Sequence, residues 1–245
     1  MTRYLCASLL LAAALLCGCA TNPATKHDPR DPFERINRAT FKFNDAVDRH
    51  VAKPIAQTYR KVTPHFVQTG VSNFMDNLTY PIVLVNDLLQ VKFKATLNDT
   101  GRLLLNTTLG LGGLLDPASD AGLAKNDEDF GQTLGRWGVR PGPYLMLPIL
   151  GPSDIRDGIG KYADRYATPY DYANDWRVRW GFWALDALDT RARLLDTEQV
   201  MSGVYDRYAF IRNAYLQRRE YLVKDGNVPE EPVDEDKMLE ESEDR

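Results

Sequence analysis

Three short segments in the middle of the chain are apolar on nearly every side. They lie at residues 81–91 (PIVLVNDLLQV), 103–115 (LLLNTTLGLGGLL) and 144–150 (YLMLPIL). A helix that crosses the hydrocarbon core of a bilayer needs about 20 apolar residues, so none of the three is predicted to span a membrane. A helix that is apolar all round must still be covered, either by protein in a bundle core or by lipid. These segments alone leave both alternatives open.

The N-terminus has the pattern of an export signal that ends at a lipidated cysteine. Arg3 precedes an apolar run at residues 5–16, and the sequence LCGC occupies residues 16–19. A weakly positive start, about a dozen apolar residues and a small-residue exit site are typical of a cleaved secretory signal. The LCGC sequence resembles the bacterial lipobox, which implies cleavage after residue 18 and lipidation of Cys19. An ordinary cleaved signal followed by a chance cysteine is the alternative.

The residue after Cys19 predicts the destination of the protein. Ala20 stands there in place of an aspartate. By resemblance to enterobacterial sorting, this favours anchoring in the periplasmic leaflet of the outer membrane over retention at the inner membrane. Cys6 and Cys17 lie in the signal, so Cys19 is the only cysteine after cleavage. No thiol then remains for a disulfide, a cysteine zinc site or a cysteine nucleophile.

Charge and composition divide the chain after the signal (residues 1–18) into three parts. Residues 19–32 are polar and interrupted by proline, and are predicted to tether the lipid to the folded body. Residues 225–245 hold ten acidic and two basic residues, which predicts a disordered acidic tail. The body at residues 33–224 has a small positive balance and no repeat or linker that divides it.

The body is predicted to be helical. Apolar residues after Asp31-Pro32 recur at steps that place them on one helical face, and Pro54 ends or bends this helix. The same periodicity predicts helices at residues 175–196 and 203–224. Basic residues of the last segment lie off its apolar stripe and are expected on a solvated face, or on a face for anionic headgroups or a porin. Strand signals are scarce, so the prediction is one all-α unit.

Two observations favour acyl chains as the cover of the apolar segments. A lipid on Cys19 would hold the body at a membrane. Trp176, Trp180 and Trp183 lie four and three residues apart on one predicted helix, and their rings suit the headgroup layer. We therefore expect short and amphipathic helices that lie in one leaflet. The core of a soluble helical bundle is the alternative.

Six sequence blocks, in order, resemble the MlaA (VacJ) lipoprotein family. They are DPFERINRATFKFN, GVSNFMDNLTYPIVLVNDLLQ, RLLLNTTLGLGGLLDPA, DFGQTLGRWGVRPGPYLMLPILGPSDIRDGIG, DTRARLLD and YAFIRNAYLQRREYL, which span residues 31–223. The resemblance implies a ring-like, all-helical body in the periplasmic leaflet, with a central amphipathic channel. It also implies association with a trimeric porin and removal of misplaced phospholipid from the outer leaflet. The phospholipid would pass to a periplasmic carrier protein, and this transport would maintain the lipid asymmetry of the outer membrane.

Transport of this kind needs no catalytic residue, cofactor or metal. An enzyme that acts on lipid or the cell wall is a rival interpretation, and His50 with Asp48 is the acid/base pair that stays open for it. There is no GxSxG or SxxK motif, and the three histidines are His27, His50 and His65. Residues 109–113 (LGLGG) do not continue into GxGxxG, and GxxxxGK[ST] is absent. Export and the modest positive balance of the body disfavour nucleic-acid binding. A structural lipoprotein that braces a porin or the envelope is the alternative function.

Two groups of residues are candidates for the wall and mouth of the channel. Gly110, Gly112 and Gly113 would allow close backbone approach or a sharp turn, and an ordinary turn between helices is at least as good an interpretation. The second group is the apolar segment Tyr144, Leu145, Met146 and Leu147, which glycine and proline bracket. It would form a mobile flap at the mouth, with a surface loop as the alternative.

Two further groups are candidates for lipid contact. By resemblance, Phe41, Phe43 and Asn44 occupy a block where the family has aromatic and asparagine residues close to its channel, although core packing is the plainer interpretation of both phenylalanines. Arg136 and Arg140 would suit a phosphate headgroup. An ion pair within the protein is the alternative for either arginine.

Overall fold

The computed structural model of the chain describes residues 28–201 and 203–228. The predicted signal, Cys19 and most of the acidic tail lie outside the described residues. The helices are α2 (Glu34–Val47), α3 (Lys53–Val62), α4 (His65–Leu89), α5 (Phe93–Thr108), α6 (Pro117–Asp120), α7 (Phe130–Arg136), α8 (Ile155–Asp164), α9 (Trp176–Arg193) and α10 (Arg207–Val223). The strands are β1 (Tyr144–Leu147) and β2 (Gly151–Asp154). The prediction of a mainly helical body is confirmed.

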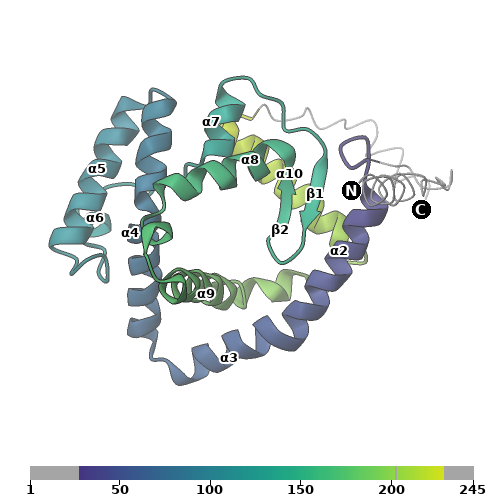
Figure 1. The fold of residues 1–245 in the computed structure, drawn as a ribbon, viewed down its shortest axis with the longest axis horizontal. Helices are drawn as coiled ribbons and strands as arrows, with labels where there is room; N and C mark the ends of the chain where they lie inside the picture. The colour runs from purple at the N-terminus through teal and green to yellow at the C-terminus, as the bar shows by residue number, and fades with distance from the viewer. Residues whose placement is uncertain (1–27, 202, 229–245) are drawn as a thin grey trace, which may run out of the picture.

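The helices and the hairpin are arranged as a ring (Figure 1). α2 and α3 form one long arc, and α4 forms the side opposite α2. α3 and α4 both pack against α9, α7 packs against α4, α8 and α10, and α10 contacts β2. β1 packs against α2, which closes the ring. α5 and α6 lie outside the ring, on the far side of α4 from its opening.

The arc from α2 to α3 bends without a loop. α2 ends at Val47, residues Asp48–Ala52 form a π-helical turn, and α3 begins at Lys53 with Pro54 in its first turn. Proline lacks only an N–H that a first helical turn leaves unpaired, so Pro54 is tolerated there. The sequence prediction that the helix ends or bends at Pro54 is confirmed.

The hairpin of β1 and β2 is the exception to the helical prediction among the described residues. Tyr144 pairs with Asp154 and Leu147 pairs with Gly151, in antiparallel register. The turn carries positive φ angles at Ile149 (66°) and Gly151 (78°). The sequence did not predict it because the turn has no Asn-Gly or Asp-Gly pair and the strands are only four residues long. The segment 144–150, expected to be an apolar flap or loop, is therefore the first strand and the turn.

The interior of the ring wall is polar. Among the residues whose burial the structure describes, eight buried side chains are apolar and seventeen are polar or charged. In the same part of the chain, thirty-seven large apolar side chains are exposed. A water-soluble domain usually buries its large apolar residues and leaves charged ones outside. The distribution here is the reverse.

Aspartates at helix N-termini help to hold the ring together. Asp129 accepts a hydrogen bond from the Gln132 N–H and caps α7, and it also pairs with Arg219 of α10. Asp206 caps α10 in the same way and pairs with Arg38 of α2 at 2.7 Å. A carboxylate at an N-cap satisfies free backbone N–H groups. Each of these caps therefore also links two elements that are distant in the sequence.

The folded body extends beyond both of its predicted bounds. Asp31, expected in the tether, is fully buried and pairs with Arg212 of α10 at 3.2 Å. Asp225, expected at the start of the tail, forms ion pairs with Lys92 and Arg136. The arginines of α10 also differ from expectation, because Arg212 and Arg219 are largely buried ion-pair partners and not part of a solvated face.

Candidate functional site

Two asparagines of α2 hold the hairpin against the inner side of the arc. The Asn37 amide donates to the Tyr144 carbonyl at 3.0 Å and accepts from the Met146 N–H at 2.9 Å. Two helical turns further along α2, the Asn44 amide donates to the Leu147 carbonyl at 2.9 Å and accepts from the Ile149 N–H at 2.8 Å. Asparagine can donate and accept at once, so Asn37 completes the free edge of β1 as another strand would, and Asn44 bonds the turn that follows β1 in the same way.

Asn37 is a positioning residue that the sequence analysis missed. It is buried, and it also donates to Asp31 at 2.7 Å. The available signal was its spacing of seven residues from Asn44, which places both amides on the same face of one helix. Asn44 was predicted near a channel, and the structure places it at the hairpin turn.

The aromatic residues around β1 form a small core. Tyr144, Met146 and Tyr208 are buried together, and Phe41 packs against them with its ring 5.8 Å from that of Tyr208. Phe41 therefore packs in the core, which was the plainer of the two interpretations of this residue. Phe43 is exposed on α2. Leu145 and Leu147 alternate with the buried residues of β1 and are half-buried.

The glycine cluster lies away from the hairpin. Gly110, Gly112 and Gly113 form the turn after α5, which is outside the ring (Figure 1). A Cβ on Gly110 would lie 2.4 Å from the Asn106 carbonyl oxygen, and one on Gly113 would lie 2.4 Å from the Asn77 Cβ of α4. Gly113 also has a φ of 99°. Gly110 is therefore explained by the tightness of the turn and Gly113 by close approach to α4, whereas Gly112, beside which an added Cβ would meet nothing, is explained by its φ of 75°.

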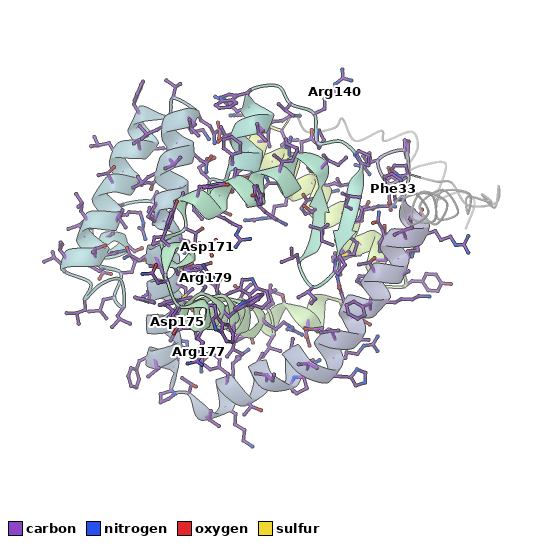
Figure 2. The ribbon with its side chains drawn as sticks, viewed as in Figure 1. Phe33, Arg140, Asp171, Asp175, Arg177 and Arg179 are labelled. Carbon is purple, nitrogen blue, oxygen red and sulfur yellow. The ribbon has the colours of Figure 1, made fainter. Side chains whose placement is uncertain are left out.

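The two candidate arginines differ in their surroundings. Arg136, at the end of α7, pairs with Asp225 at 2.9 Å. Arg140 is exposed in the loop before β1, and Figure 2 shows it directed away from the ring. No ion pair of Arg140 is found within the part of the chain that the structure describes. The structure therefore does not bring Arg136, Arg140, the glycine cluster and the hairpin into one site.

A buried ion-pair network joins α7, α8 and α10 behind the hairpin. Arg219 donates to both carboxylate oxygens of Asp129, at 2.6 and 2.9 Å, and to Asp157 at 2.8 Å. Tyr215 donates to Asp157 at 2.6 Å. Burial alone would raise the pKa of Asp129, but the bonds from Arg219 outweigh it and lower that pKa. Burial, followed by the bond to Asp157, raises the pKa of Tyr215.

A second buried cluster lies where α4 meets α5. Asp87 is fully buried, and no donor within the described residues bonds to either of its carboxyl oxygens. Its neighbour Asp99 accepts from Tyr80 and Asn126, at 2.9 and 2.8 Å. Burial, then the neighbouring Asp99 carboxyl and the negative charge of Glu128, raise the pKa of Asp87 to about 8. Asp87 therefore keeps its proton at neutral pH.

The protonated Asp87 predicts how stability varies with pH. An unfolded aspartate loses its proton near pH 4, whereas folded Asp87 keeps its proton up to about pH 8. The folded state binds the extra proton in that window, so rising pH disfavours folding by up to about 1.4 kcal/mol per unit. We expect Asp87→Asn to remove this slope and to be more stable than the wild type at pH 8. Denaturant unfolding in detergent from pH 4.5 to 9 measures the difference.

A control variant separates Asp87 from the other carboxyl groups. Asp120→Asn removes an exposed carboxylate, and its pH profile should follow that of the wild type. Burial raises the pKa of Asp164 to about 6. Titration of Asp164 therefore contributes equally to the pH dependence of stability in the wild type and in both variants. Parallel profiles for Asp87→Asn and the wild type would show that Asp87 is ionised in the folded protein.

The exposed apolar side chains lie on several sides of the ring. On the arc they include Ile36, Phe43, Ile55 and Val62. Outside α4 they include Phe93, Leu97 and Leu104, and on α9 the three tryptophans Trp176, Trp180 and Trp183. A water-soluble domain more often buries side chains of this size. None of the helices that the structure describes is both long and apolar enough to cross a membrane.

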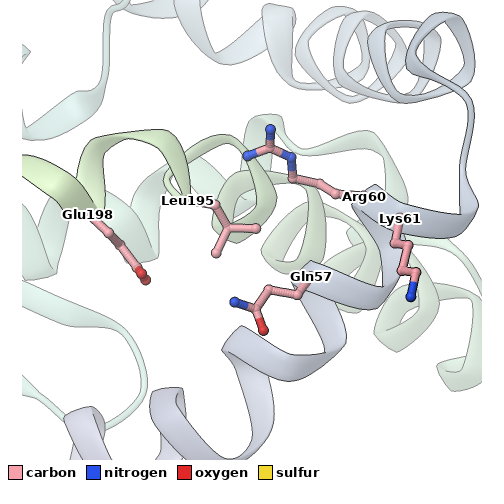
Figure 3. A pocket seen from close by; sticks show the side chains of 5 residues that line it. All are labelled: Gln57, Arg60, Lys61, Leu195 and Glu198. Carbon is pink, nitrogen blue, oxygen red and sulfur yellow. The ribbon is translucent and has the colours of Figure 1, made fainter.

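One open cavity of about 390 Å³ lies at the corner between α3 and the segment after α9 (Figure 3). Its lining is mainly polar and comprises Gln57, Arg60, Lys61, Leu195 and Glu198. Arg60 pairs with Asp196 at 2.7 Å and Lys53 with Glu198 at 2.6 Å, so the cavity lies beside ion pairs that fasten this corner. Among the described residues, no cluster of three or more histidine, cysteine or acidic side chains could hold a metal ion.

Comparison with known proteins identifies the family. A family model described as MlaA lipoprotein matches residues 29–222. The intermembrane phospholipid transport system lipoprotein MlaA of Escherichia coli is 35% identical over 225 residues, which are 90% of this chain and 89% of the relative. The protein of the same name from Haemophilus influenzae is 34% identical over 232 residues, 90% of this chain and 91% of the relative. A solved structure, described as the structural basis for maintenance of bacterial outer membrane lipid asymmetry, has a TM-score of 0.72 and 36% identity, and the match covers 79% of this chain and 98% of that one. This chain therefore belongs to the MlaA lipoprotein family.

Proposed function

We propose that this protein is an outer-membrane lipoprotein that removes mislocalised phospholipids from the outer leaflet and passes them to a periplasmic carrier. Its activity would maintain the lipid asymmetry of the outer membrane. The observation that carries the proposal is the reversed distribution of side chains, with a polar ring wall and a surface rich in large apolar residues. The names of the relatives, which are intermembrane phospholipid transport lipoproteins, support it.

The reversed distribution suits a body that lies within one leaflet. Exposed apolar side chains on the arc, on α5 and on α9 would contact acyl chains, and no polypeptide cover would then be needed. Buried ion pairs would hold the ring together where apolar packing supplies little. The exposed tryptophans of α9 would lie near the headgroup layer.

The opening of the ring would serve as the channel. Moving a phospholipid out of its leaflet is opposed by about 0.8 kcal/mol for each CH₂ that meets water. A route through a protein must therefore cover the tails and give the headgroup polar partners. The hairpin, held on the inner side of α2 by Asn37 and Asn44, would form part of that route. No bond is made or broken, so the proposal requires no catalytic residue.

The remaining parts of the proposal concern segments and partners beyond the described residues. Residues 1–18 would be the signal, Cys19 the lipidated N-terminus and the acidic residues after 228 a tail. A trimeric porin would hold the ring in the outer membrane, and the periplasmic carrier would take up the phospholipid that leaves it. Directional flow would come from that downstream acceptor.

Lipid analysis tests the function against the alternative of a structural brace. Protein extracted from membranes in mild detergent should carry phospholipid through purification, measured by mass spectrometry. Cells that lack the protein should accumulate phospholipid in the outer leaflet, measured by enzymatic labelling of intact cells. A brace for a porin or the envelope would do neither, so a lipid-free protein and an unchanged outer leaflet would overturn the proposal.

Substitution of Cys19 tests the anchor separately. We expect Cys19→Ala to remain an unprocessed precursor, because lipidation of that sulfur precedes cleavage in the lipobox pathway. Immunoblots of separated inner and outer membranes should show a larger protein that is depleted from the outer membrane. A matched Cys17→Ala variant should be processed normally. Normal fractionation of Cys19→Ala would contradict the anchor.

A further inference from the structure

A second cavity, of about 300 Å³, lies where α8 leads into α9. It is lined by Tyr162, Arg165, Tyr166, Asp171 and Tyr172. The 3₁₀ turns that carry the last four of these residues contact α4 and α9. In Figure 2, Asp171 lies at the inner edge of the ring, next to the first turn of α9 with Asp175, Arg177 and Arg179. Asp171 therefore places one side of the cavity near the inner edge of the ring, where the proposed route of the phospholipid lies.

Three tyrosine rings form the walls of this cavity. Tyr162 and Tyr166 are one turn apart on the same side of the chain, with ring centroids 6.1 Å apart and planes at 85°. The Tyr172 hydroxyl donates to the Tyr166 carbonyl at 2.5 Å, which fixes the third ring beside them. The three residues are 64%, 68% and 66% exposed, so their ring faces are accessible. Accessible aromatic faces attract ammonium groups through the ring quadrupole.

The charged groups of the cavity are one arginine and one aspartate, paired with each other. Arg165 Nε donates to Asp171 Oδ2 at 2.9 Å. The Arg165 side chain is 66% exposed, and a pair that exposed contributes little to stability. The pair can therefore be exchanged at small cost for two pairs with a ligand that carries both charges.

We propose that the cavity of Tyr162, Tyr166, Tyr172, Arg165 and Asp171 binds the zwitterionic headgroup of a phospholipid, a phosphate joined to an ammonium. This inference rests on the proposed function and names the headgroup class that it handles. Arg165 donates to the phosphate, and Asp171 with the tyrosine rings receives the ammonium. Arginine suits phosphate geometry, and the net charge of the cavity stays zero throughout the exchange.

The same geometry disfavours an anionic headgroup. A phosphatidylglycerol headgroup has the phosphate but no ammonium, so Asp171 would lose Arg165 and face an added negative charge. The Asp171 side chain is only 20% exposed, so a second negative charge beside it, without a cation, is costly. The cavity should therefore prefer phosphatidylethanolamine to phosphatidylglycerol by about tenfold, which corresponds to about 1.4 kcal/mol.

Binding of short-chain lipids to the full chain in detergent tests the inference. The probes are dihexanoyl phosphatidylethanolamine and dihexanoyl phosphatidylglycerol, which share their tails. We expect the wild type to bind the first about tenfold more tightly, and Asp171→Asn to bind the two within about twofold. Tyr166→Leu should lower the affinity for the phosphatidylethanolamine probe about threefold and leave the affinity for the phosphatidylglycerol probe unchanged. Tyr205→Leu, at a fully exposed tyrosine outside the cavity, should change neither affinity.

Each contrary outcome has a definite meaning. Equal affinity of the wild type for both lipids, or a preference that survives Asp171→Asn, would overturn the headgroup site. If Tyr205→Leu changes the lipid affinities as much as Tyr166→Leu does, the cavity tyrosines act only as general contacts with the membrane interface. That result would also overturn the headgroup site. The proposed function would survive these outcomes if the purified protein still carries phospholipid.

Discussion

Replacing Arg219 with alanine is expected to lower the free energy of unfolding by about 3 kcal/mol. Arg219 is 12% exposed and bonds to Asp129 and Asp157, which belong to α7 and α8. Its removal leaves the buried Asp157 carboxylate and the half-buried Asp129 carboxylate without their main partner. Arg156 stays 3.2 Å from Asp157, which keeps the loss at the lower end of the range for a broken buried pair. Denaturant unfolding in detergent micelles measures the change.

Arg218 provides the matched control for Arg219. It precedes Arg219 on α10 and pairs with Asp127 at 3.0 Å, but both side chains are 67% exposed. Exposed pairs contribute about 0–1 kcal/mol, so Arg218→Ala should leave stability nearly unchanged. Equal losses in the two variants would mean that the network around Arg219 does not hold α10 in the ring.

The helices of this protein could be predicted from its sequence, but the partners of their charged residues could not. Apolar periodicity predicted helices that match α9 (Trp176–Arg193) and α10 (Arg207–Val223). The same periodicity placed Arg212 and Arg219 off the apolar stripe, on a face expected to meet solvent, anionic headgroups or a porin. Their partners Asp31 and Asp157 are 181 and 62 residues away along the chain. Only the closed ring brings these charges together.

The candidate site shows the same division. Asn44 was identified through a family block, and its bonds to the hairpin could not be foreseen because residues 144–154 lack the Asn-Gly or Asp-Gly pair that marks a tight hairpin. The exposed tyrosines at the end of α8 were missed because Tyr162 and Tyr166 read as one side of an ordinary amphipathic helix. The sequence did predict that the short apolar segments must be covered by protein or by lipid. The polar interior now favours lipid as that cover.

Gly160→Ala is expected to destabilise the protein by about 3 kcal/mol or more, at the upper end of the range for overpacking. A Cβ on Gly160 would lie 2.4 Å from the backbone nitrogen and 2.8 Å from the Cα of Gly131. Backbone atoms cannot turn aside as a flexible side chain can, so α7 and α8 would have to separate. Thermal unfolding in detergent should show a clear fall in the melting temperature.

Gly158→Ala is the control, two residues earlier on the same helix. Its added Cβ would meet only the Ser153 Oγ, at 3.9 Å, and alanine favours helix over glycine, so stability should rise by about 0.5–1 kcal/mol. The close crossing at Gly160 also allows Arg219 to reach Asp129 and Asp157 at once. Separation of α7 from α8 would break that bridge, so the losses in a Gly160→Ala/Arg219→Ala double variant should sum to less than the two single losses. Strict additivity would mean that the helix crossing and the ion-pair network stabilise the ring independently.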